Sequence, residues 1–244
     1  MSKKAVKSFL GKIGFEVQRS DPSRTYPKRR QLALVDRNVD LVLDVGAHAG
    51  EFAQSLRHHG YDGKIRSFEP LQKLYTRLEI AAKRDSDWSC HKLAVGNRAG
   101  SIEMNISGND GFSSSVLQML PQHQLADPSS AYVAAEVVEL TTLDAQVSTS
   151  LGGCSTFLKV DTQGFEKEVI EGAAETLNHC ALIELELALV ELYEGQALFD
   201  EMVGLLEKKG FVLNDLEPGF RDDGTGRLLQ VDALFVCRER SPGA

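Results

Sequence analysis

Apolar residues follow two patterns along most of this chain. Segments that read as strands occur at 41–45, 64–69, 90–95, 156–161 and 181–187, and those at 41–45, 156–161 and 181–187 are mostly apolar, as in buried strands. Segments with apolar residues three or four positions apart lie between many of these runs, and two of them are followed directly by a glycine. The helical segments occupy about 51–59, 71–84, 166–177 and 199–209. This alternation predicts an α/β fold with a doubly wound, mostly parallel sheet.

Two hairpins are also predicted, each where strand-like segments follow one another without a helix. Residues 211–216 and 228–237 are joined by a connection rich in Asp, Gly and Thr, which predicts an antiparallel pair at the C-terminal end. A turn at 97–100 is predicted to pair the run at 90–95 with the alternating segment 101–106. A sheet that is parallel except for a C-terminal hairpin is atypical of nicotinamide dehydrogenases, which run a second parallel half.

Residues 107–131 are rich in Ser, Gly, Asn, Asp and Pro, and we expect a long loop there. Long loops inside a compact domain often contact substrate, so this segment is a candidate for acceptor recognition. It contains three consecutive serines, at positions 113–115, whose hydroxyls could hydrogen-bond a ligand. The alternative is that they only form a flexible turn.

Charge divides the chain into a short basic segment and an acidic remainder. Residues 1–30 hold nine Lys or Arg and two acids, whereas the other 18 basic residues stand against 33 acids. Within the basic segment, apolar residues at Val6, Phe9, Leu10 and Ile13 alternate with lysines and predict a short amphipathic helix. This helix either packs on the domain or contacts a membrane surface weakly, and the acidic remainder argues against a nucleic-acid partner.

Length and composition suit one folded domain. A chain of 244 residues with 42% hydrophobic content buries one substantial core. Asp21-Pro22 and Tyr26-Pro27 predict a loop after the basic segment, followed by a helix from about Arg30 to Asp36. We therefore expect a basic helical extension over 1–37 and an α/β domain over 38–240. Self-association through the extension is left open.

Cysteine spacing and hydropathy indicate a cytoplasmic protein. The four cysteines are far apart in sequence, without a zinc-binding or redox pair, and we expect reduced core residues. No apolar stretch reaches the roughly 20 residues that a membrane helix needs. No small-residue cleavage site follows an apolar block near the N-terminus, so a secretory signal is not expected. At most, the basic helix would lie at the inner face of the membrane.

The strand at 41–45 leads into a glycine turn that is typical of nucleoside-binding sites. Asp44 ends the apolar run, and Gly46 and Gly50 let the backbone approach a ligand and enter a helix. The next strand ends at Glu69, where such folds bind ribose hydroxyls, and Pro70 stops it. The spacing differs from the glycine pattern of dinucleotide enzymes and favours S-adenosylmethionine, although the acid alone fits either cofactor.

Seven short motifs occur in one order along the chain, and together they resemble the FkbM-type methyltransferases. They are Asp44-Val-Gly-Ala-His-Ala-Gly50, Phe68-Glu-Pro70, Leu93-Ala-Val-Gly96, Ser113-Ser-Ser115, Thr142-Leu-Asp144, Phe157-Leu-Lys-Val-Asp-Thr-Gln-Gly164 and Glu171-Gly-Ala173. The resemblance implies a class I methyltransferase fold and S-adenosylmethionine as donor. It also implies O-methylation of a hydroxyl on a sugar, glycolipid or related natural product. His48 is a departure, because the family more often has Asn there.

The resemblance also implies which residues hold the donor. The turn would bind its methionine part, Glu69 the ribose, and the backbone at Ala94 and Val95 the adenine side. The complete set of cofactor-binding candidates is Asp44, Gly46, Ala47, His48, Gly50, Glu69, Pro70, Ala94, Val95, Ser114 and Asp161.

Asp161 is the main candidate for the chemistry, because it ends a strand at the edge of the sheet where ligands bind. It could orient the acceptor, accept its proton, hold the donor's ammonium or bind a metal; alternatively, it only caps the next helix. His48 is a second candidate base, because imidazole titrates near neutrality. A Mg²⁺ ion could be bound by Asp161 with Glu184, and we expect only one of Glu184 and Glu186 to face the site.

Two other classes of function stay open on the sequence alone. A nicotinamide or other nucleotide-dependent enzyme could use the same glycine turn. A non-catalytic nucleoside-binding protein could keep the turn and the carboxylate at Glu69 without transferring a methyl group. The sequence does not identify the methyl acceptor.

Overall fold

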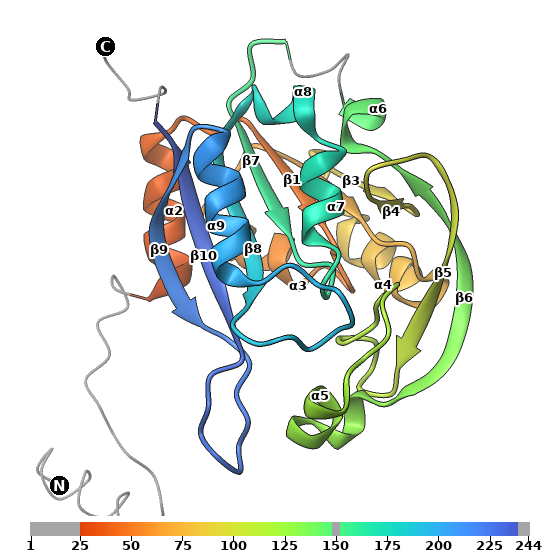
Figure 1. Cartoon of the computed structure of the whole chain (residues 1–244). Coiled ribbons are helices and arrows are strands. Elements are labelled where there is room, and N and C mark those ends of the chain that lie inside the picture. Colours follow the sequence, from red (N-terminus) through yellow and green to blue (C-terminus); the bar gives the residue numbers. More distant parts are fainter. Residues whose placement is uncertain (1–24, 148–151, 239–244) are drawn as a thin grey trace, which may run out of the picture.

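The computed structural model describes residues 25–147 and 152–238, and its centre is a twisted seven-stranded sheet (Figure 1). The strand order is β3-β2-β1-β7-β8-β10-β9. Strands β3, β2, β1, β7 and β8 are parallel, whereas β10 runs antiparallel to both β8 and β9. The doubly wound sheet and the C-terminal hairpin predicted from the sequence are thus confirmed.

The strands of this sheet are β1 (Leu41–Val45), β2 (Lys64–Phe68), β3 (Trp88–His91), β7 (Thr156–Val160), β8 (Cys180–Ala188), β9 (Phe211–Pro218) and β10 (Gln230–Cys237). A separate three-stranded sheet, ordered β4-β6-β5, is formed by β4 (Ala94–Val95), β5 (Gly100–Ser107) and β6 (Tyr132–Thr141). It lies at the side of the molecule, beyond β3 and α4 (Figure 1).

Helices cover both faces of the large sheet. They are α2 (Tyr26–Asp36), α3 (Glu51–His58), α4 (Gln72–Ala82), α5 (Pro121–Ala126), α6 (Leu143–Val147), α7 (Glu166–Glu171), α8 (Ala174–Leu177) and α9 (Phe199–Lys208), with a short 3₁₀ turn η2 (Pro128–Ser130). Helices α2, α3 and α4 pack on one face, and α7, α8 and α9 on the other. This three-layer arrangement follows from strands that are apolar on both sides.

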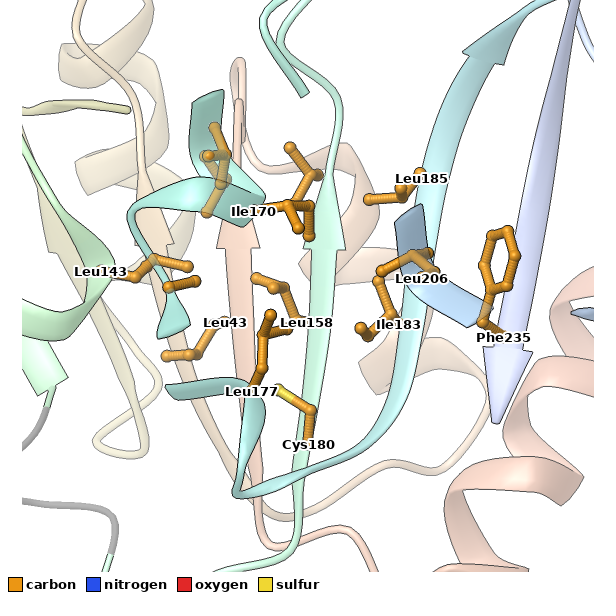
Figure 2. Close-up of a cluster of buried hydrophobic side chains, with 14 of the residues drawn as sticks. Leu43, Leu143, Leu158, Ile170, Leu177, Cys180, Ile183, Leu185, Leu206 and Phe235 are labelled. Atoms are coloured by element: carbon orange, nitrogen blue, oxygen red, sulfur yellow. The ribbon is translucent and has the colours of Figure 1, made fainter. Parts of the chain in front are cut away.

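The two faces of the sheet have separate cores because side chains alternate along each strand. On one face, residues such as Leu43, Leu158 and Ile183 pack against α7, α8 and α9 (Figure 2). On the other, Phe157 and Leu182 pack with residues of α2, α3 and α4. Strands β1 and β7 are buried along their whole length and β8 nearly so, and polar side chains within these three strands are therefore informative about function.

Four local predictions were wrong. The run at 90–95 is split between β3 and β4, and the turn at 97–100 forms no hairpin, because β4 and β5 each pair with β6 instead. Helix α2 begins at Tyr26, since a proline fits the first turn of a helix without loss of a hydrogen bond. The segment 107–131 contains α5 and η2 and is an ordered part of the fold.

The helix predicted over 166–177 is interrupted at Gly172. A Cβ atom at this position would lie 1.9 Å from the carbonyl oxygen of Gly96, so only glycine allows the two backbones to approach this closely. The chain therefore leaves α7 and starts α8 two residues later.

The predicted amphipathic helix near Val6–Ile13 lies outside the described residues, and its partner stays a prediction. Among residues 25–147 and 152–238, no helix is long and apolar enough to cross a membrane. The four cysteines are thiols that form no disulfide. Cys180 is buried in a core, Cys90 and Cys237 are partly buried against the cores, and Cys154 belongs to neither, so the prediction of core positions holds for three of the four.

Candidate active site

A cavity of about 550 Å³ opens at the carboxyl ends of the parallel strands. In open α/β sheets ligands bind at this edge, outside the strand ends. One side of the cavity is formed by the turn after β1, the segment after β2, and β4. The other side is formed by the ends of β7 and β8, by β10, and by the first turn and a half of α2. These two sides differ in their chemistry.

The turn after β1 has the backbone shape that the glycines predicted. Gly46, His48 and Gly50 all have positive φ, at 80°, 51° and 93°. At Gly46 a Cβ atom would lie 1.8 Å from the carbonyl oxygen of Asp161, because β1 and β7 are neighbouring strands. This contact brings the turn and Asp161 to the same place in the cavity.

Glu69 is buried beside the turn and holds its shape. One carboxylate oxygen accepts a hydrogen bond from the backbone N–H of His48 at 3.0 Å, and the other from that of Leu71 at 2.9 Å. Burial raises the pKa of Glu69 to about 8, although the two backbone hydrogen bonds act in the opposite direction. The side chain lines the cavity, so its remaining lone pairs can accept from a ligand.

Asp161 lies at the end of β7 with its side chain one-third exposed to the cavity. Its carboxylate accepts from the ammonium of Lys159 at 3.0 Å and from the side-chain amide of Gln163 at 3.0 Å. Burial acts against the charged form, but Lys159 and these hydrogen bonds outweigh it and hold the pKa of Asp161 below its usual range. Asp161 is therefore an ionised acceptor at neutral pH.

Glu186 lies close to Asp161 and has the opposite tendency. The same Gln163 amide also donates to the Glu186 carboxylate. Burial, together with the charge of Asp161, raises the pKa of Glu186 well above its ordinary value. Of the two neighbouring carboxyl groups, Glu186 therefore retains a proton more readily, and Asp161 carries the charge.

The expectation that only one of Glu184 and Glu186 faces the site was wrong. Residues two apart in a strand share a face, and both line the cavity together with Asp232, which is opposite Glu186 on β10. Glu184 is buried and forms an ion pair of 2.6 Å with Arg30 of α2. Burial raises the pKa of Asp232 to about 6.

A metal site at Asp161 and Glu184 finds no support in this geometry. The buried ammonium of Lys159 donates a hydrogen bond to Asp161 and occupies the position where a metal ion would bind that carboxylate. Glu184 is bonded to Arg30 instead. Among the described residues there is no group of three His, Cys, Asp or Glu side chains that could hold a metal ion.

His48 contacts a loop over the glycine turn. Its ring stacks on Phe112 with centroids 4.1 Å apart, its Nε2 lies 3.0 Å from the carbonyl oxygen of Asp110, and its Nδ1 lies 3.2 Å from Glu51. The partner of each ring nitrogen is an acceptor oxygen, so these contacts hold His48 between the loop and Glu51. His48 lines the cavity with both ring nitrogens engaged in these contacts.

The three serines at 113–115 are buried and ordered, which excludes a flexible turn. The Ser114 hydroxyl accepts from the backbone N–H of Ser107 at 3.1 Å, and Ser115 donates to the carbonyl oxygen of Gln163 at 2.7 Å. Ser114 also lines the cavity. The loop thus connects the smaller sheet to the segment that follows Asp161.

Most of the candidates named from the sequence come together here. Nine of them line the cavity: Gly46, Ala47, His48, Glu69, Pro70, Ala94, Val95, Ser114 and Asp161. Asp44 and Gly50 do not. Asp44 is buried below the turn, where it accepts from Ser67 at 2.9 Å and burial raises its pKa to about 6. Gly50 begins α3 and faces Trp88.

Several cavity residues were not foreseen. Lys159 and Asp232 are charged residues within buried apolar strands, and this anomaly in the pattern is a signal that could have identified them. Tyr26 and Arg30 precede the first strand, and no local feature marked them as part of the site.

A glycine turn after the first strand, a carboxylate after the second and an antiparallel strand inserted next to the last define a class I methyltransferase, and this chain has that fold. Residues 44–213 match the model of the Methyltransferase FkbM domain. The chain belongs to the FkbM methyltransferase family. This family uses S-adenosylmethionine, so the nicotinamide alternative is set aside.

Several known proteins are similar to this chain, and the first two described here are methyltransferases. The 2-O-methyltransferase NoeI of Sinorhizobium fredii is 26% identical over 193 residues, which cover 76% of this chain and 79% of NoeI. The N-methyltransferase NodS from Bradyrhizobium japonicum, solved with S-adenosyl-L-homocysteine, aligns with a TM-score of 0.44 at 12% identity, covering 88% of this chain and 89% of NodS. Fibrillarin from Aeropyrum pernix, solved with S-adenosyl-L-methionine, gives a TM-score of 0.41 at 12% identity, covering 85% and 74%.

Proposed function

We propose that this methyltransferase transfers the methyl group of S-adenosylmethionine to a hydroxyl of a saccharide or a saccharide-containing lipid or natural product. The observation that carries the proposal is the ionised Asp161 carboxylate, which faces the cavity directly beside the glycine turn. The similarity to a 2-O-methyltransferase supports oxygen as the methylated atom. 

In the proposed complex the donor lies along the first side of the cavity. The turn from Gly46 to His48 holds the methionine part through backbone N–H groups, Glu69 accepts from the ribose hydroxyls, and Ala94 and Val95 contact the adenine. The acidic residues of the opposite side favour the positive sulfonium of the donor. The acceptor then enters between the methyl group and Asp161.

Methyl transfer forms a C–O bond and breaks the S–CH₃ bond, whose electron pair stays on sulfur. The acceptor hydroxyl becomes a protonated ether as it reacts, and this species is strongly acidic. A carboxylate with a low pKa, such as Asp161, is therefore a sufficient base for its proton. Asp161 would first orient the hydroxyl by accepting its hydrogen bond, which aligns the oxygen with the methyl group. Lys159 and Gln163 hold the carboxylate in place.

The direct test is a transfer assay with radiolabelled S-adenosylmethionine and a panel of methyl pyranosides. Mass spectrometry of the product should show an added mass of one methylene group, and the fragments should place it on a hydroxyl oxygen of the sugar. Methylation of amines with no product from any glycoside would end this proposal.

We expect the donor affinity to depend on the ionisation of Glu69. The ionised carboxylate accepts from ribose better than the protonated form, and its pKa is about 8. Affinity for S-adenosylhomocysteine should therefore rise from pH 6.5 to pH 8.5, by roughly tenfold or more. Calorimetric titration across this range measures the effect. The Glu69→Gln variant should bind S-adenosylhomocysteine more weakly. Any change of affinity with pH that remains in this variant comes from the amine of the ligand. Equal pH profiles in the two proteins would contradict the assignment.

We expect methyl transfer to survive removal of divalent cations, because Lys159 already neutralises Asp161. Dialysis against a chelator, followed by the transfer assay with and without added Mg²⁺, should give rates that agree within about twofold. Loss of activity that Mg²⁺ restores would instead show that Asp161 or Glu184 binds a metal during turnover.

A further inference from the structure

The side of the cavity opposite the glycine turn contains a group of incompletely satisfied polar atoms. Tyr26, Arg30 and Glu184 line the cavity and are at least nine-tenths buried, at 5%, 6% and 1% exposure. The Tyr26 hydroxyl, the Nε of Arg30 and one carboxylate oxygen of Glu184 make no well-aligned hydrogen bond, although Tyr26 and Glu184 interact with each other. Buried polar atoms are nearly always hydrogen-bonded, so three such atoms lining one cavity point to a polar ligand there.

The rest of this group is held firmly. The other carboxylate oxygen of Glu184 pairs with Arg30, and the Arg30 guanidinium lies over the ring of Phe52 at 4.5 Å and over that of Tyr26 at 5.4 Å. The neighbouring Arg29 pairs with Asp215 of β9 and so fixes α2 against the sheet. These contacts keep the three side chains in position before any ligand binds.

The hydrogen-bond donors and acceptors among these atoms match those of two adjacent hydroxyl groups. Arg30 Nε can only donate, the carboxylate oxygen of Glu184 can only accept, and the Tyr26 hydroxyl can do both. Adjacent sugar hydroxyls each donate and accept, so they can satisfy all three after small side-chain shifts. The charge of the cavity disfavours an anionic acceptor, because seven acidic side chains and only two Lys or Arg line it, although Glu69 and Glu186 hold their protons more readily than ordinary carboxyl groups.

Tyr26 and Arg30 also lie outside residues 44–213, which match the family model. The methyl donor and Asp161 are accommodated by the matched segment. The unsatisfied group therefore belongs to a part of the cavity that the transfer chemistry does not use.

We infer that Tyr26, Arg30 and Glu184 form the acceptor subsite and determine specificity by binding two adjacent hydroxyls of a neutral saccharide. This inference rests on the proposed function. It makes α2 a part of the site, rather than an extension that only packs on the domain.

Tyr26→Phe is the sharpest test, because it removes only a hydroxyl that makes no well-aligned hydrogen bond in the free protein and keeps the packing of the ring, so the loss of stability should be small. For a glycoside that the wild type methylates, we expect the acceptor KM to rise about three- to tenfold, the range of one hydrogen bond. The KM for S-adenosylmethionine and the melting temperature should stay unchanged. Arg30→Lys, which keeps the charge but not the fork of donors, should also raise the acceptor KM.

Matched controls are Tyr61→Phe and Arg57→Lys, whose side chains do not line the cavity. Arg57 pairs with Asp85 at 2.7 Å, away from the proposed subsite. Tyr61 donates to the carbonyl oxygen of Lys64 at 3.2 Å, so its variant loses stability without a change in either KM. Wild-type acceptor KM in both Tyr26→Phe and Arg30→Lys would overturn the inference and leave the proposed function intact. Preference for a sugar phosphate over the neutral glycoside would overturn it as well, whereas absence of transfer to every glycoside would end the proposed function itself.

Discussion

Asp161→Asn should lower kcat for methyl transfer by about 100- to 10,000-fold, the range that a positioned acid–base group contributes. Asparagine can still accept a hydrogen bond from Lys159 or Gln163, so the cavity keeps its shape. It cannot take up the proton that leaves the acceptor oxygen. Affinity for S-adenosylhomocysteine should change little, since Glu69 and the glycine turn hold the nucleoside. Single-turnover transfer assays and calorimetric titration measure the two quantities separately.

Asp144→Asn provides the matched control for this substitution. Asp144 caps α8 by accepting from the backbone N–H of Thr176 at 2.8 Å, and it does not line the cavity. Its variant keeps one acceptor oxygen for Thr176 and loses the one that accepts from the backbone N–H of Glu175, so it should unfold at a slightly lower temperature and keep the wild-type kcat. A kcat for Asp161→Asn within about twofold of the wild type would exclude Asp161 from the chemistry.

Gly46→Ala should reduce the free energy of unfolding by about 3 to 5 kcal/mol and abolish donor binding. The added methyl group would lie 1.8 Å from the backbone oxygen of Asp161, so β1 and β7 would have to separate at the point where the donor binds. The positive φ of 80° adds strain for any residue with a Cβ atom. Urea unfolding and titration with S-adenosylhomocysteine give the two results.

Gly210→Ala separates the two causes. Gly210 has nearly the same φ, 88°, but a Cβ atom there would meet no atom within 4 Å. It should therefore cost only the roughly 1–2 kcal/mol of the left-handed conformation, and donor binding should persist. An equal loss of stability in the two variants would show that the backbone conformation matters and the contact with Asp161 does not.

The sheet and the donor side of the site could be predicted because both depend on neighbouring residues. A buried parallel strand must be apolar, so β1, β7 and β8 are visible as continuous runs. The turn at Gly46 and the carboxylate at Glu69 follow directly from strand ends. Parallel pairing then brings these ends to one edge without further information.

The acceptor side could not be predicted in the same way, because it is assembled from distant parts of the chain. Arg30 and Glu184 are 154 positions apart in the sequence, and no local feature near either residue predicts their contact. The hairpin predicted at 97–100 is wrong for a related reason. Strand β5 pairs with β6, which is longer and comes later in the chain, and does not pair with β4. Local patterns identify elements, but the choice of partner is a property of the whole fold.

The division of the cavity has an evolutionary consequence. On the proposed assignment, the residues that hold the donor and carry the chemistry lie between β1 and β8, whereas Tyr26 and Arg30 of the acceptor subsite come from α2. Mutations in α2 would then change which molecule is methylated while the transfer machinery stays the same. A lineage would acquire a new acceptor by drift in α2, and laboratory exchange of this helix is the corresponding route to altered methylation products.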